Sequence, residues 1–207
     1  MEAVVLNQKW KEAWKIELNE STFGVETNEW LVHRALVYQL ANARLNIAFT
    51  KTRGERRWST RKIYRQKWTG RARMWSNRSP IRKKGWVVFG PRGVENYKIS
   101  MNKKERRKAL FSVLSSKFKN NQLLIVDDIK LKEIKTKLAE SVISAFPYEK
   151  KILLAMPEKN EVLQKASSNL QYVKTILVDY LNISDLLKYD TLILLKKSLD
   201  NLDSLTK

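Results

Sequence analysis

The apolar residues of this chain recur in short continuous runs, and amphipathic segments separate the runs. Four runs lie in the second half of the chain, at 123–128 (LLIVDD), 151–156 (KILLAM), 172–178 (YVKTILV) and 191–195 (TLILL). Helical periodicity lies between and after them, at 137–146, 160–168, 184–188 and in the C-terminal tail. Continuous apolar runs that alternate with amphipathic helices are typical of parallel strands covered on both faces. The pattern therefore predicts a three-layer α/β/α domain with a mainly parallel central sheet.

The first 46 residues add two strands and a helix to this domain. The strands are expected at 3–6 and 15–18, with a polar turn at 7–11 between them. The helix is expected to start near Asn28, with Thr27 or Asn28 as its N-cap and Glu29 in its first turn. One apolar stripe is expected to face the core, made of Leu31, Ala35, Leu36, Leu40 and Ala43.

Between about residues 50 and 98 the periodicity stops. Arg and Lys alternate there with Ser, Thr, Gly and Trp, and a further helix is expected only at 103–118. Such a segment cannot bury enough apolar surface to offset the entropy of ordering it. We therefore expect a long extended basic internal loop at 47–100, mobile alone and ordered by a partner. It would divide the globular α/β domain into a first part at 1–46 and a remainder at 101–207.

The charge of the chain follows the same division. From Lys51 to Lys108 there are 21 Lys and Arg against three Glu, a net charge of +18 out of +20 for the whole chain. Positive charge concentrated in one extended segment is the electrostatic footprint of a polyphosphate partner. The sequence therefore predicts a nucleic-acid-binding loop on an otherwise near-neutral domain.

Composition excludes several other classes of protein. The chain has no cysteine and one histidine, His33, so thiolate and multi-histidine metal sites are excluded. The N-terminus lacks the basic start and apolar run of a signal peptide, and no apolar run approaches the roughly 20 residues that span a bilayer. We expect a soluble, intracellular protein with no membrane partner.

Two acids offer a candidate metal site. Asp127 and Asp128 end an apolar run at the carboxyl edge of the predicted sheet, where α/β enzymes place ligands. A metal there would favour an enzyme acting on nucleic acid. However, no GxGxxG or GxxxxGK[ST] turn follows any predicted strand, so a phosphate cradle is missing. We therefore favour a helix N-cap role for these acids and expect no metal and no cofactor.

Residues 65–73 read RQKWTGRAR, which resembles the RQKGTGRAR signature of bacterial large-subunit ribosomal protein four. Further similar motifs follow the same order along the chain: QLANAR (39–44), TKTRGE (50–55), RSP (78–80), VVFGPR (87–92), NKKERRKAL (102–110), VDDIKL (126–131) and LLKYDTLIL (186–194). The resemblance covers about Val4 to Leu199, and several motifs in the right order make it specific.

The resemblance implies a structural constituent of the large ribosomal subunit, not an enzyme, with no small-molecule substrate. Its α/β domain would lie on the outer surface of the subunit, support assembly and contact neighbouring ribosomal proteins. Its loop would thread into large-subunit ribosomal RNA and reach the wall of the peptide exit tunnel, with 66–73 as the tip. We expect a monomer when free. Two alternatives stay open: an autoregulator that binds the messenger-RNA leader of its own operon, and a general nucleic-acid-binding protein.

The expected RNA contacts are mainly the cations of the loop. Arg and Lys neutralise phosphates and release counterions, and Arg also makes planar bidentate contacts. Neutralising roughly ten phosphates would give a logarithmic salt slope near −9 on duplex-like RNA and less on single strands. The expected contact residues are Lys51, Arg53, Arg56, Arg57, Arg61, Lys62, Arg65, Gln66, Lys67, Thr69, Gly70, Arg71, Arg73, Arg78, Arg82, Lys83, Lys84 and Arg92.

The chain has seven Trp and only six Gly. By the resemblance, Trp68, Trp75 and Trp86 stand where the family pattern has Gly, Trp58 lies in its Gly-rich stretch, and Trp10 and Trp14 lie where Gly is common; Trp30 is less clear. One hypothesis is that these are UGA codons read as glycine in the source lineage and translated here as tryptophan. Stacking on RNA bases is a second interpretation, and ordinary core or surface tryptophan a third.

Overall fold

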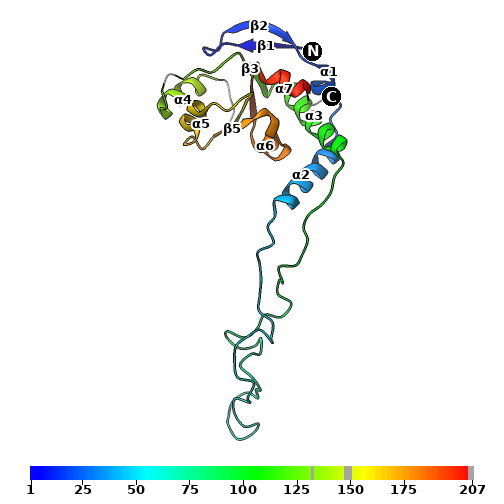
Figure 1. Ribbon diagram of the computed structural model, residues 1–207, viewed down its shortest axis with the longest axis vertical. Coiled ribbons are helices and arrows are strands. Elements are labelled where there is room, and N and C mark those ends of the chain that lie inside the picture. Colours follow the sequence, from blue (N-terminus) through cyan, green and yellow to red (C-terminus); the bar gives the residue numbers. More distant parts are fainter. Residues whose placement is uncertain (132, 147–150, 205–207) are drawn as a thin grey trace. The chain divides into compact units, whose positions relative to one another are not determined.

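The computed structural model describes residues 1–131, 133–146 and 151–204 (Figure 1). The chain divides into two compact units. Met1–Ala41 and Ile99–Lys207 form the first, here called the α/β unit, and Asn42–Lys98 form the second, here called the loop unit.

The α/β unit is built on one six-stranded sheet. Its strands are β1 (Glu2–Leu6), β2 (Glu12–Glu17), β3 (Leu123–Val126), β4 (Ile152–Met156), β5 (Val173–Leu177) and β6 (Thr191–Leu195). They lie in the order β2-β1-β3-β6-β4-β5. Only the β1–β2 hairpin is antiparallel among the strand pairs of the described residues; the other pairs are parallel. The predicted mainly parallel sheet is therefore confirmed.

Seven α-helices accompany the sheet in the described part of the chain. They are α1 (Glu20–Phe23), α2 (Glu29–Ala43), α3 (Lys103–Lys119), α4 (Thr136–Ile143), α5 (Glu161–Ser167), α6 (Ile183–Lys188) and α7 (Ser198–Ser204), and a 3-10 helix spans Val178–Tyr180. None of the helices described is long and apolar enough to cross a bilayer.

Two hydrophobic clusters cover the two faces of the sheet. Leu153 and Ala155 of β4 join the cluster that contains residues of α1, α2, α3, α6 and α7. Ile152, Leu154 and Met156 of the same strand join the other cluster, which contains residues of α4 and α5. Because successive strand residues point to opposite faces, a strand buried on both sides reads as an unbroken apolar run. The predicted three layers are confirmed.

The helix that leads into the loop unit is fixed at its N-terminus. The Asn28 side chain accepts a hydrogen bond from the Leu31 N–H at 3.0 Å, as expected of an N-cap. The Asn28 N–H itself donates to Ser112 Oγ on α3 at 2.9 Å. The start of α2 is therefore tied to α3 within the α/β unit.

The predicted apolar stripe of α2 is wrong in its second half. Leu31 and Ala35 are buried, but Leu40 is 56% exposed and Ala43 is exposed. Periodicity shows which residues share a face of a helix, but the buried residues of α2, Leu31 and Ala35, lie only in its first half. Farther along α2, a polar contact joins it to α3: Arg106 donates to the Tyr38 hydroxyl at 3.2 Å, and its guanidinium lies 5.4 Å from the Tyr38 ring centroid.

A buried lysine joins α3 to the turn before β6. The Lys117 ammonium donates to the main-chain oxygens of Tyr189 and Asp190 at 2.9 and 2.8 Å. Burial lowers the pKa of Lys117, and the nearby Asp190 carboxylate opposes this shift. The hydrogen bonds offset part of the cost of burying the charge.

The expected N-cap role of Asp127 and Asp128 is wrong. These acids do follow β3, but the next helix, α4, starts at Thr136 with Lys135 as its N-cap residue. The Asp127 N–H donates to the Leu6 oxygen at 3.1 Å, and Asp128 pairs with Lys130 at 3.6 Å. In the part of the chain that the structure describes, no cluster of three or more potential metal ligands occurs.

Candidate nucleic-acid interface

The loop unit contains no helix or strand after the end of α2 (Figure 1). None of its residues is buried, and large apolar side chains such as Ile47, Ile81 and Phe89 are exposed. Turns and side-chain contacts therefore define its path. None of the expected RNA-contact residues is buried. Four are half-buried, namely Arg56, Lys62, Thr69 and Arg78. The others are exposed: Lys51, Arg53, Arg57, Arg61, Arg65, Gln66, Lys67, Gly70, Arg71, Arg73, Arg82, Lys83, Lys84 and Arg92.

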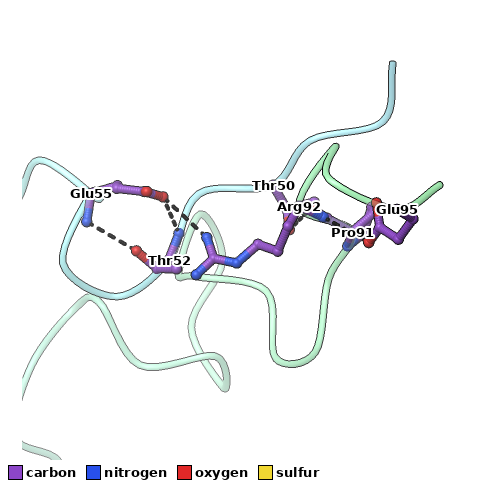
Figure 2. A network of polar contacts seen from close by, with 6 residues as sticks. All are labelled: Thr50, Thr52, Glu55, Pro91, Arg92 and Glu95. Atoms are coloured by element: carbon purple, nitrogen blue, oxygen red, sulfur yellow. Dashed lines mark hydrogen bonds and ion pairs between the residues drawn. The ribbon is translucent and has the colours of Figure 1, made fainter. Parts of the chain in front are cut away.

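Polar contacts join the two ends of the loop unit, as Figure 2 shows. The Thr50 N–H donates to the Pro91 oxygen at 2.9 Å. The Glu55 carboxylate accepts from the Thr52 N–H at 2.7 Å and pairs with Arg92 at 3.4 Å. We call this network, with Glu95, the clasp (Thr50, Thr52, Glu55, Pro91, Arg92 and Glu95). It joins segments about 40 residues apart in the sequence. Local turn motifs do not predict contacts over such a separation.

Glu95 extends the clasp toward the α2 end of the loop unit. Its carboxylate accepts from the Arg92 N–H at 3.2 Å and from the Asn46 amide at 3.2 Å. Next to it, the Arg44 guanidinium lies 3.8 Å from the Tyr97 ring centroid, a cation–π contact. Glycine is required at 90, because a Cβ there would meet the Thr50 side chain at 2.0 Å.

The two acids of the clasp should titrate below an ordinary glutamate. The Thr52 N–H and hydroxyl and the Arg92 charge lower the pKa of Glu55. The main-chain N–H groups of Glu95 itself and Arg92 lower the pKa of Glu95. Because a lowered folded pKa stabilises the folded form above the ordinary pKa, the clasp should be intact at neutral pH and loosen as pH falls through the lowered values. NMR titration of both carboxylates checks this; titration at ordinary glutamate values would contradict it.

Arg78 makes internal contacts that the sequence did not indicate. Its guanidinium donates to the Trp58 oxygen at 2.7 and 3.1 Å and to the Arg53 oxygen at 3.4 Å. It therefore holds two distant parts of the loop unit together. Close to it, Gly85 leaves no room for a side chain, since a Cβ there would lie 2.0 Å from the Ser79 oxygen.

The tip of the loop unit is a series of turns. Tyr64 donates its hydroxyl to the Ala72 oxygen, which closes the turn around residues 65–71. Arg65 donates to the Trp68 oxygen at 3.0 Å, and Lys62 to the Gln66 amide oxygen at 2.7 Å. Gly70 has φ +63°, a conformation that glycine adopts without strain.

The charge of the loop unit is left largely uncompensated. Its two acids, Glu55 and Glu95, are both engaged within the clasp. Among the described residues, Arg92 is the one cation of 51–98 that lies within ion-pair distance of a carboxylate. An array of exposed Arg and Lys with no acidic partners repels itself and attracts a polyanion. This arrangement suits phosphate neutralisation and stacking, and it offers no set of acid, base and nucleophile for catalysis.

Sequence reasoning found the cations but missed the residues that position them. Asn46, Thr50, Thr52 and Tyr64 hold the loop unit by hydrogen bonds, and none of them was among the expected contacts. One signal was present in the sequence: Glu55 and Glu95 are the only acids between residues 51 and 98. Two acids within so basic a segment indicate that each carboxylate binds specific groups of the segment itself.

Comparison with known proteins finds relatives that match almost the whole chain. Residues 16–205 match the Ribosomal protein L4/L1 family. The large ribosomal subunit protein uL4 of Agathobacter rectalis is 44% identical over 199 residues, which cover 96% of each chain. The protein of the same name from Alkaliphilus oremlandii is 40% identical over 199 residues, again 96% of each chain. That from Dehalococcoides mccartyi (strain BAV1) is 40% identical over 205 residues, covering 99% of this chain and 97% of the relative.

Proposed function

The chain belongs to the Ribosomal protein L4/L1 family, as a relative of bacterial uL4 proteins, and we propose that its loop unit binds large-subunit ribosomal RNA. Its role is structural and ribosomal, in the cytoplasm, and it is not an enzyme, as the sequence predicted. Within that role, the α/β unit supports subunit assembly and contacts neighbouring proteins. The tip at 66–73 contributes to the wall of the peptide exit tunnel.

The observation that carries the proposal is the uncompensated charge of the loop unit. Its exposed cations lack carboxylate partners among the described residues, while its two acids are used in the clasp. Phosphates of folded RNA supply the missing counter-charge, and each contact releases condensed counterions. Arg adds stacking and bidentate hydrogen bonds that Lys does not offer.

The contact set is the expected cations apart from the two that join distant parts of the loop unit. Arg78 and Arg92 are engaged within the loop unit and would contribute mainly by holding its shape. The remaining expected cations would contact phosphates, and Gln66, Thr69 and Gly70 would lie against RNA at the tip. The free protein would be a monomer whose loop is ordered by RNA.

Competition binding tests the proposal. The full-length protein is bound to labelled large-subunit ribosomal RNA at moderate salt, then challenged with the same RNA, with the messenger-RNA leader of its operon, and with unrelated RNA of equal length. We expect the ribosomal RNA to compete far better than the unrelated RNA, with a salt slope approaching −9 for roughly ten phosphates. Equal competition by all three would indicate a general nucleic-acid binder, and preference for the leader would indicate a regulator; either contradicts the proposal.

A further inference from the structure

Residue 10 lies in a backbone conformation that suits glycine. It closes the β1–β2 turn, where its N–H donates to the Asn7 oxygen at 2.8 Å and the Asn7 N–H donates to the Lys11 oxygen at 2.9 Å. Its φ is +62°. In hairpins of this kind the residue after the turn adopts the left-handed conformation, and glycine is strongly preferred there. Tryptophan at this position strains the main chain.

The Trp10 side chain is also poorly accommodated. Its ring centroid lies 3.4 Å from that of Phe146 at an interplanar angle of 86°. Edge-to-face aromatic pairs prefer centroid separations of about 4.5–7 Å, so these rings are too close. The indole N–H is buried, and no residue in the described part of the chain accepts its hydrogen bond. An unpaired buried donor is unfavourable, and a glycine removes all three defects at once.

Position 68 in the loop unit also has positive φ, as do Lys84 and Phe89 of the same unit. Trp68 has φ +63°, and its side chain is 86% exposed. Gly70, two residues later, has the same φ of +63°. An exposed indole gains little from packing, so nothing in the free protein offsets the strain of a left-handed tryptophan. Stacking on RNA would account for the exposure but not for the sign of φ, and it does not apply to the buried indole N–H of Trp10.

The composition of the chain also indicates that tryptophan stands at positions that suit glycine. Seven Trp and six Gly among 207 residues invert the usual balance, since glycine ordinarily makes up about 7% of a protein. Two other tryptophans of the loop unit are more than half exposed: Trp58 and Trp75. Large aromatic side chains are usually buried on average. An excess of exposed tryptophan with a deficit of glycine is the result expected if one codon has been assigned to the wrong amino acid.

We propose that the protein made in the source cells carries glycine at positions 10 and 68. The gene has UGA at both positions, and the source lineage reads UGA as glycine. The printed sequence arises when the same gene is translated with a code that reads UGA as tryptophan. The inference is independent of the RNA-binding role, because one of the two positions lies in the α/β unit and the other in the loop unit.

The codons and the natural protein test this proposal directly. The gene is sequenced at positions 10 and 68, and the peptides that span them are measured by mass spectrometry of protein purified from the source cells. The expected result is UGA with a glycine residue mass at both positions. UGG, or a tryptophan residue mass, at either position would overturn the proposal.

Recombinant variants test the physical argument separately. Trp10→Ala removes the indole but keeps a Cβ at positive φ. Trp10→Gly removes the indole and also the backbone strain. Trp10→Gly is therefore expected to melt about 2–4 °C above Trp10→Ala, from the backbone strain alone. Trp30→Gly, in the first turn of α2 at 68% exposure, is the control and should melt below Trp30→Ala. Equal or lower melting of Trp10→Gly relative to Trp10→Ala would overturn the proposed role of position 10.

Discussion

Replacing Arg57, Arg61, Arg71 and Arg73 together with glutamine is expected to weaken binding to large-subunit ribosomal RNA by roughly 100- to 1,000-fold near physiological salt. All four side chains are exposed and make no ion pair with a carboxylate of the described residues. Each phosphate that is no longer neutralised lowers the salt slope by about one unit, so the slope should fall by about 3 to 4. Filter binding or anisotropy at several salt concentrations measures both quantities.

A matched variant distinguishes the effect of where the positive charge lies from the effect of how much net charge is removed. Lys9, Lys137, Lys165 and Lys188 are exposed residues of the α/β unit, and changing them to glutamine removes the same net charge. This control should retain most of the affinity and nearly the full salt slope, since diffuse charge contributes only long-range attraction that salt screens. An equal drop in affinity in both variants would mean that net charge, and not the loop unit, governs binding.

Leu192→Ala is expected to have the largest effect on stability. Leu192 is 0% exposed on β6, in register with Leu123 of β3 and Leu153 of β4. Truncating a fully buried leucine removes its transfer free energy and leaves a cavity, at a cost of about 2–5 kcal/mol. For a chain of this length the melting temperature should fall by roughly 5–20 °C. Thermal denaturation followed by circular dichroism measures the change.

The same substitution at an exposed leucine provides the control. Leu187 lies on α6 and is 51% exposed. Leu187→Ala should change the free energy of unfolding by no more than about 0.5 kcal/mol. If the two variants melted alike, β6 would not lie at the centre of the sheet as described.

The sequence predicted the sheet because its strands are buried on both faces. The runs at 151–156 and 191–195 are apolar without alternation, and amphipathic helices lie between the apolar runs. The parallel arrangement of the strands follows from this pattern alone. The same reasoning failed for Leu40 on α2, because periodicity indicates which residues share a face but not whether another element covers it. It failed for Asp127 and Asp128 because an N-cap must adjoin its helix. The helix that periodicity predicts from 137 starts at Thr136, well beyond both acids.

The charge of the loop unit was equally clear from composition, but its internal structure was not. The clasp depends on Glu55 meeting Arg92, and the fold of the loop unit also depends on Arg78 meeting the Trp58 oxygen. Such pairings join residues far apart in a segment without periodicity, where local propensity carries no information. The positive φ of residues 10 and 68 likewise emerges only from the backbone, although the balance of Trp and Gly had already indicated an anomaly.

The most direct test of the RNA-binding account is protein–RNA crosslinking on large ribosomal subunits purified from the source cells, read out by mass spectrometry. The account predicts that the protein is present in stoichiometric amount and that its crosslinks to large-subunit ribosomal RNA concentrate between residues 51 and 84, with the tip at 66–73 among them. Absence of the protein from the subunit, or crosslinks confined to the α/β unit, would contradict it.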